Sequence, residues 1–189
     1  VHHPNEIAQS EAATGKQFVR YWVHHGHLMF DGQKMSKSLG NIVRVEDVVE
    51  KGFDPLALRY FYLTASYRKP QNFTWEALAG AQKALEELRN HLLAKSQTQL
   101  SSEKMEKIDV YRNKFNEALA NDLNTPQALA VVWEVVKSNI PSQDKYDVLL
   151  NFDEVLGLKF AETVANRNQK TEIPEEIKTL LQEREKLRG

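Results

Sequence analysis

The chain has 189 residues, of which 41% are hydrophobic and 27% charged, and its 25 Lys and Arg residues nearly balance its 26 Asp and Glu residues. This composition excludes a disordered chain and a polybasic tail, although a balanced total charge still permits a basic face that binds nucleic acid. The absence of cysteine excludes disulfides, thiol catalysis and zinc held by cysteines of this chain. The sequence shows neither a secretory signal nor an apolar run long enough for a membrane helix, so we expect a cytoplasmic protein without a membrane partner.

Glycine is concentrated in the first 52 residues, which contain five of the eight glycines. Because glycine marks turns and close backbone approaches, this part is predicted to consist of short elements and loops. In chain order, we predict a helix over 5–14 that Asn5 caps, extended segments over 18–30, a turn at Asp31-Gly32 and a short helix over 46–51.

Beyond residue 52, apolar residues recur at helical spacing, and caps and prolines mark the helix starts. Helices are predicted to begin at Pro55, after Thr74, after Ser101-Ser102, at Asn124-Thr125-Pro126 and at Pro141. The helix after Thr74 is predicted to bury Leu78, Ala81, Leu85, Leu88 and Leu92, and the next one Met105, Ile108, Tyr111, Phe115 and Leu119. The sequence therefore predicts a mainly α fold, with a helical bundle behind a compact mixed segment.

The segment Lys34-Met35-Ser36-Lys37-Ser38 is the most informative for chemistry, and it lies between Gly32 and Gly40. Two lysines and two hydroxyls on a glycine-flanked loop can form a mobile cationic clamp. During an ATP-dependent adenylylation, ammonium groups that meet the charge on the phosphate oxygens lower the barrier. We therefore predict that Lys34 and Lys37 are catalytic and bind ATP, and that Ser36 and Ser38 bind ATP and shape the loop.

The same five residues resemble the second signature of class I aminoacyl-tRNA synthetases, and further segments resemble the cysteinyl-tRNA synthetases in particular. These segments stand in the order of that family: residues 2–11 (HHPNEIAQSE), 21–24 (YWVH), 54–60 (DPLALRY), 121–128 (NDLNTPQA) and 152–158 (FDEVLGL). The resemblance implies a cysteine–tRNA ligase, whose substrates are ATP (with Mg²⁺), cysteine and tRNA(Cys).

The resemblance also implies how the chain is organised. Residues 1–52 correspond to the end of a class I α/β catalytic domain, and residues 53–158 to an antiparallel DALR-type helical bundle. A linker over 159–173 then leads to the start of a truncated C-terminal domain over 174–189. Because the nucleotide-binding half of the family's catalytic domain is not among these residues, the chain is expected to be a monomeric fragment without activity of its own.

The family holds zinc with two cysteines, a histidine and a glutamate, and the resemblance assigns the last two ligands to His2 and Glu6. These two residues are spaced i and i+4, so they share one face of a helix. Because the cysteines are absent from this chain, zinc is expected in the full-length parent rather than here.

Two other functions stay open, namely a cysteine:amino-sugar ligase and a non-catalytic tRNA-binding module. Among single residues, Arg59 is expected to pair with a carboxylate such as Asp54, and a contact with tRNA is the alternative. The turn Arg68-Lys69 is expected to contact tRNA phosphates, which would position tRNA without reading its sequence. The resemblance places His24 in the wall of the amino-acid pocket.

Overall fold

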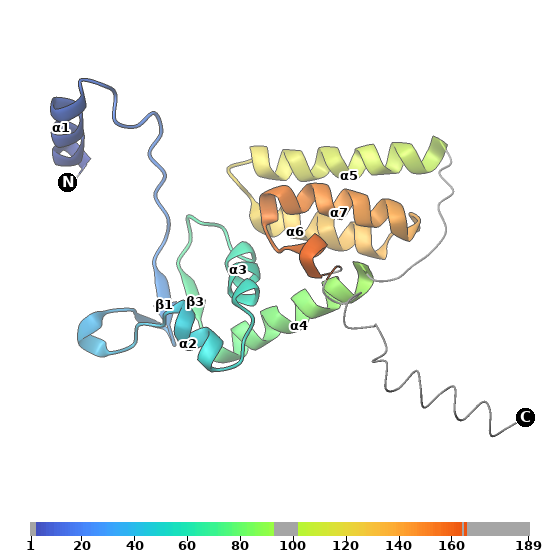
Figure 1. Ribbon diagram of the computed structural model, residues 1–189, viewed down its shortest axis with the longest axis horizontal. Helices are drawn as coiled ribbons and strands as arrows, with labels where there is room; N and C mark the ends of the chain where they lie inside the picture. The colour runs from blue at the N-terminus through green and yellow to red at the C-terminus, as the bar shows by residue number, and fades with distance from the viewer. Residues whose placement is uncertain (1–2, 93–101, 164, 166–189) are drawn as a thin grey trace, which may run out of the picture.

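The computed structural model describes residues 3–92, 102–163 and 165, and it is mainly helical, as predicted (Figure 1). The helices are α1 (His3–Thr14), α2 (Val45–Glu50), α3 (Pro55–Leu63), α4 (Trp75–Leu92), α5 (Ser102–Ala120), α6 (Thr125–Lys137) and α7 (Ser142–Leu156); the strands are β1 (Leu28–Phe30), β2 (Gln33–Lys34) and β3 (Gln71–Phe73); a 3-10 turn, η1, covers Lys37–Leu39. In Figure 1, α1 stands apart at the end of an extended segment. Among the described helices, none combines the length and apolar character needed to span a bilayer.

The small sheet has the strand order β2-β1-β3, with β1 antiparallel to β2 and parallel to β3. The predicted turn joins β1 to β2, and both Asp31 and Gly32 have positive φ, at 47° and 76°, as a tight hairpin requires. Although extended structure is predicted over 18–30, only residues 28–30 form a strand, because β2 and β3 pair with that stretch alone.

Helices α3, α4 and α6 start where the sequence predicts, and Thr74 and Asn124 are the predicted caps, whereas the cap at Asp54 was not predicted. The side chains of Asp54, Thr74 and Asn124 accept hydrogen bonds from backbone N–H groups in the first turns of α3, α4 and α6, at 2.8, 3.0 and 3.2 Å. Helix α1 is an exception, since it begins at His3 and places Asn5 inside the helix rather than at its cap.

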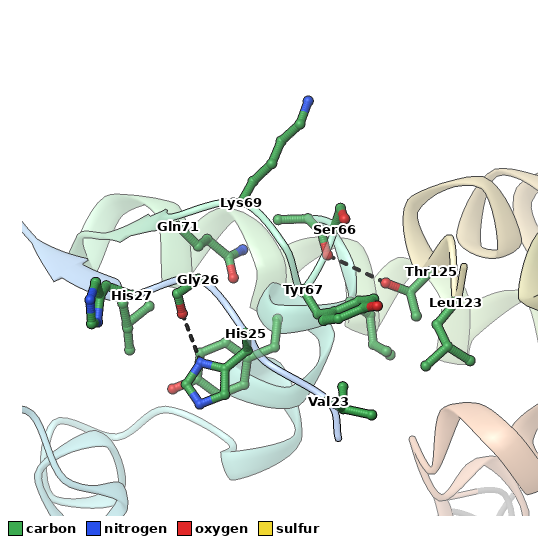
Figure 2. Close-up of a pocket in the computed structure, with 14 residues that line it drawn as sticks. Val23, His25, Gly26, His27, Ser66, Tyr67, Lys69, Gln71, Leu123 and Thr125 are labelled. Atoms are coloured by element: carbon green, nitrogen blue, oxygen red, sulfur yellow. Dashed lines mark hydrogen bonds between the residues drawn. The ribbon is translucent and has the colours of Figure 1, made fainter. Parts of the chain in front are cut away.

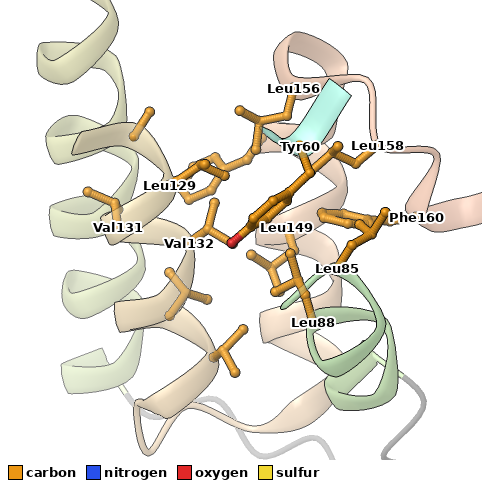
Figure 3. Packing of buried hydrophobic residues seen from close by; sticks show 14 of the residues in the cluster. Tyr60, Leu85, Leu88, Leu129, Val131, Val132, Leu149, Leu156, Leu158 and Phe160 are labelled. Atoms are coloured by element: carbon orange, nitrogen blue, oxygen red, sulfur yellow. The ribbon is translucent and has the colours of Figure 1, made fainter. Parts of the chain in front are cut away.

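The hydrophobic core lies where α3, α4, α6 and α7 meet (Figure 3). All five residues predicted for the buried face of α4 are in it. Figure 3 shows Tyr60 of α3 among leucine and valine side chains of the neighbouring helices, and its hydroxyl accepts a hydrogen bond from Trp133 Nε1 at 3.0 Å. Val48 of α2 and Phe73 of β3 belong to the same cluster, so the core continues from the mixed segment into the bundle.

The prediction for α5 is partly wrong. Ile108 and Phe115 are buried, and Phe115 stacks on Phe152 of α7 with ring centroids 4.0 Å apart. Met105, however, is 57% exposed, because it borders an open hollow of about 210 Å³ between α5 and α7 instead of packing against α7. Ala118 is buried farther along the helix.

The C-terminal end of α7 is held by two side chains. Its carbonyls at Leu156 and Val155 accept hydrogen bonds from the Arg59 guanidinium of α3, the second at 3.4 Å. The Asp153 carboxylate accepts from the N–H groups of Leu158 and Phe160, at 2.6 and 2.8 Å. The side chains of Leu158 and Phe160 are fully buried, although residue 160 falls in the segment predicted to be a linker.

The expected pair between Arg59 and Asp54 is wrong. The Asp54 carboxylate caps α3 and accepts from Arg89 Nη1 at 2.6 Å. Five residues along an α-helix correspond to a rotation of about 140°, so Arg59 faces away from Asp54 and toward α7. There the cation meets carbonyl groups that lack partners within their own helix, at the negative end of its dipole.

Replacement of Arg59 by alanine is expected to lower the free energy of unfolding by about 1–2 kcal/mol, because α7 loses the cation at its C-terminus. Urea denaturation followed by circular dichroism measures this change. Arg112→Ala is the matched control, since Arg112 is exposed and its ion pair, at 3.5 Å, is with Asp109 of its own helix. For Arg112→Ala the free energy of unfolding should fall by no more than about 0.5 kcal/mol. An equal fall for the two variants would contradict the role of Arg59.

Gly157→Ala is expected to be more destabilising than Gly52→Ala. Both glycines have positive φ, at 63° and 83°, so an alanine at either position carries a conformational cost of about 1 kcal/mol. Only at Gly157 would the new Cβ lie 2.9 Å from a guanidinium nitrogen of Arg59, whereas nothing lies within 4 Å at Gly52. In an Arg59→Ala background the two alanine variants should therefore become equal in a double-mutant cycle of unfolding free energies.

Candidate functional site

The signature residues 34–38 begin on the outer strand of the β1–β2 hairpin, with Lys34 as the last residue of β2. Strand β3 fixes the turn of that hairpin. The Asn72 side chain accepts from the Gly32 N–H at 2.7 Å, and the Phe73 carbonyl accepts from the Asp31 N–H at 3.1 Å. The hairpin therefore presents the signature from a position set by the sheet.

The signature itself is a compact turn rather than an open loop. The Ser36 hydroxyl caps η1 by accepting from the Leu39 N–H at 3.3 Å, and Gly40 ends the turn with a φ of 62°. Asn41 closes the base, since its side chain accepts from the Ser36 N–H at 2.9 Å and donates to the Lys34 carbonyl at 3.2 Å. Sequence reasoning missed this role of Asn41, for which an amide side chain directly after a glycine is the local signal.

The polar side chains of the signature remain available for a ligand. Lys34, Lys37 and Ser38 are exposed, and neither ammonium group meets a carboxylate within the described part of the chain. The hydroxyls of Ser36 and Ser38 lie 3.2 Å apart. Two unpaired cations beside two hydroxyls suit an anion such as a polyphosphate. The assignment of these residues to ATP stays a prediction.

Of the two predicted metal ligands, the structure describes only Glu6, so the assignment of His2 and Glu6 to a metal stays a prediction. His2 lies outside the described residues, and the Glu6 carboxylate faces His3 Nδ1 at 3.1 Å. Within the described ranges, no group of three or more histidine or acidic side chains is placed to hold a metal ion. With no cysteine in the sequence, the chain supplies at most two of the four ligands that the family uses, so its residues do not complete a zinc site.

The His3 ring lies instead in a small aromatic group. Its centroid is 4.2 Å from that of Trp22 and 4.9 Å from that of His24. His24 therefore contacts α1, and its predicted place in an amino-acid pocket stays a prediction.

A cavity of about 580 Å³ lies away from the signature, between the segment leading into β1, the end of α3 and the α5–α6 turn (Figure 2). Tyr62, Tyr67 and Leu123 contribute to its wall. Figure 2 shows the Lys69 side chain pointing away from the other lining residues. Sequence reasoning missed this cavity, because its walls come from segments that are far apart in the chain.

The turn Arg68-Lys69 is only partly available for phosphates. The Arg68 guanidinium binds the Asp122 carboxylate through two nitrogens, at 2.5 and 2.9 Å, and the Tyr67 hydroxyl donates to the same carboxylate at 2.7 Å. These bonds hold the pKa of Asp122 below its usual range and raise the pKa of Tyr67. Lys69 remains without a carboxylate partner among the described residues.

Comparison with known protein families gives two matches in chain order. The catalytic domain of the class I (C) tRNA synthetases matches residues 1–83, and the DALR domain matches residues 114–140. The first match contains the signature and the sheet, and the second contains the α5–α6 turn.

Curated relatives resemble the chain over most of its length. A cysteine–tRNA ligase from Burkholderia lata is 42% identical over 191 residues, which cover 100% of this chain and 38% of the relative. One from Prochlorococcus marinus is 38% identical over 218 residues, which cover 97% of this chain and 44% of the relative. The chain thus spans less than half the length of these relatives.

A solved structure agrees at the level of the fold. The LeuRS chain of a ternary LeuRS–tRNA–LeuAMS complex from Agrobacterium radiobacter superposes with a TM-score of 0.53 and 19% identity, covering 74% of this chain and 20% of that chain. The fold, the ordered motifs and the relatives lead to one assignment: the chain belongs to the cysteine–tRNA ligase family of class I aminoacyl-tRNA synthetases.

Proposed function

We propose that the full-length protein is a cysteine–tRNA ligase that activates cysteine with ATP, releases pyrophosphate and transfers the cysteinyl group to tRNA(Cys). The observation that carries this proposal is that the ammonium groups of Lys34, at the end of the hairpin, and of Lys37, in the turn after it, are exposed and meet no carboxylate among the residues that the structure describes. The identity of the relatives supports the choice of amino acid.

Each signature residue has a distinct part in the proposal. Lys37, on the outward turn, meets the oxygens of the phosphates while pyrophosphate departs, and Lys34 assists from the end of β2. Ser36 is engaged as the cap of η1 and in contact with Ser38, so its main contribution is to hold the turn. Mg²⁺ would enter with ATP as part of the substrate.

The partners follow from the same proposal. Lys69 is the residue of the basic turn that is left for a tRNA phosphate, since Arg68 is bound by Asp122. Zinc would need ligands in addition to those of this chain, which has no cysteine. A cytoplasmic monomer is the form we propose for the protein.

Lys37→Ala in the full-length protein is expected to slow ATP–pyrophosphate exchange by about 10²–10³-fold, because the cation acts where charge develops in the transition state. Lys83→Ala is the matched control, since this lysine is exposed on α4, far along the chain from the signature. An exchange rate that Lys37→Ala leaves unchanged would contradict the role of Lys37.

A non-catalytic tRNA-binding module is the second candidate, and the match of the DALR domain over residues 114–140 favours it. In that case the chain alone should bind tRNA, and log Kd should rise linearly with the logarithm of the salt concentration, because phosphate contacts release counterions. Filter binding at several salt concentrations measures the slope, and binding indifferent to salt would exclude phosphate contacts. Transfer to an amino-sugar instead of tRNA would identify the remaining alternative.

A further inference from the structure

We propose that Asp122 is a positioning residue, whose carboxylate fixes the α5–α6 turn against the loop before β3 and, through that loop, sets the bundle relative to the signature strand. The kinetic consequence of this inference rests on the proposed function, whereas its structural consequence does not.

Both oxygens of the exposed Asp122 carboxylate accept hydrogen bonds. Asp122 Oδ2 accepts from Arg68 Nε at 2.5 Å, and Oδ1 accepts from Arg68 Nη2 at 2.9 Å and from the Tyr67 hydroxyl at 2.7 Å. Both oxygens are therefore used by two adjacent residues that lie more than fifty positions earlier in the chain. A bidentate arginine–carboxylate pair fixes the orientation of the two groups as well as their distance.

The backbone conformation of the α5–α6 turn orients the Asp122 carboxylate toward Arg68. Asp122 and Leu123 have φ values of 56° and 51°, so two consecutive residues other than glycine adopt the left-handed conformation. Such a conformation persists only where neighbouring contacts impose it. Here the N–H groups of Leu123 and Asn124 donate to carbonyls of α5, both at 3.0 Å, and the Thr125 hydroxyl donates to the Ala65 carbonyl at 3.4 Å.

Two hollows adjoin the contact between the α5–α6 turn and the loop before β3. Residues of the loop over 64–70 and of the α5–α6 turn border both a hollow of about 580 Å³, shown in Figure 2, and another of about 630 Å³. The hydrogen bonds from Tyr67 and Arg68 to Asp122 connect the turn directly to the loop beside these hollows.

The loop over 64–70 is in turn hydrogen-bonded to the segment that leads into β1 and the signature. The Tyr67 carbonyl accepts from the Gly26 N–H at 2.6 Å, and the His27 carbonyl accepts from the Gln71 N–H at 3.1 Å. A Cβ at Gly26 would lie 2.5 Å from the backbone of Lys69, so the two segments are in direct contact. Strand β1 starts two residues after Gly26 and pairs with β2, which ends at Lys34.

This arrangement predicts different effects on the two steps of the proposed reaction. Activation of cysteine needs the signature, whereas transfer also needs tRNA held at the correct place by the bundle. Loss of the Asp122 carboxylate should therefore slow transfer to tRNA and spare activation.

The test uses Asp122→Asn in the full-length protein, because asparagine has the same shape and tolerates positive φ. We expect kcat/KM for tRNA cysteinylation to fall by about tenfold, a typical coupling effect, while ATP–pyrophosphate exchange stays within about twofold. Glu134→Gln is the matched control: Glu134 is equally exposed and accepts from Lys114 at 2.8 Å, but this pair lies within the bundle. The control should change neither rate.

Two further measurements separate positioning from simple stability. Arg68→Gln should reproduce the loss, and the double variant should be no worse than either single one. Equal losses of exchange and transfer, or a double variant with added losses, would overturn the inference. If the unaltered protein shows no exchange, the proposed function fails, but amide hydrogen exchange over 24–30 still decides the inference: it should be faster in Asp122→Asn and unchanged in Glu134→Gln.

Discussion

A helix of nine residues is too short to be stable in water by itself, yet α3 is the element against which the rest of the structure is assembled. Helices α2, α4 and α6 pack on it, and its buried face includes Ala57, Leu58, Tyr60 and Phe61. Its stability must therefore come from its surroundings. Asp54 and Pro55 define its start, and Arg59 ties its exposed side to the end of α7.

The position of α3 also explains why the signature and the bundle belong to one body. The core reaches from Val48, just before α3, to Phe152 and Phe160 at the other end of the described chain. The catalytic segment and the bundle are thus not joined by a flexible connection at residue 52. The hydrogen bonds of Arg59 and Asp122 fix the relative orientation of segments that the apolar core holds together by packing.

The sequence predicted what local physics determines. The caps at Thr74 and Asn124 and the apolar stripe of α4 follow from interactions within one or two turns, and all were predicted correctly. The start of α3 at Pro55 was predicted as well, but the cap at Asp54 was not. The signature could be identified for the same reason, since its chemistry resides in five adjacent residues. Contacts between distant segments could not be predicted in this way: the partners of Arg59 and Arg68 lie 54 to 97 positions away. The exposure of Met105 likewise depends on how closely α5 and α7 approach, which the spacing of apolar residues does not encode.

The parallel pairing of β1 with β3 has a consequence for how the chain assembles. The β1–β2 hairpin closes across two turn residues, whereas β1 meets β3 only after the chain has passed through the signature, α2 and α3. Closing the longer loop has the larger entropic cost, and local contacts form faster than distant ones. Strand β3 is also what anchors the hairpin turn, through Asn72 and Phe73. By this reasoning the hairpin can close before it is anchored, and the signature reaches its final position only once β1 has paired with β3.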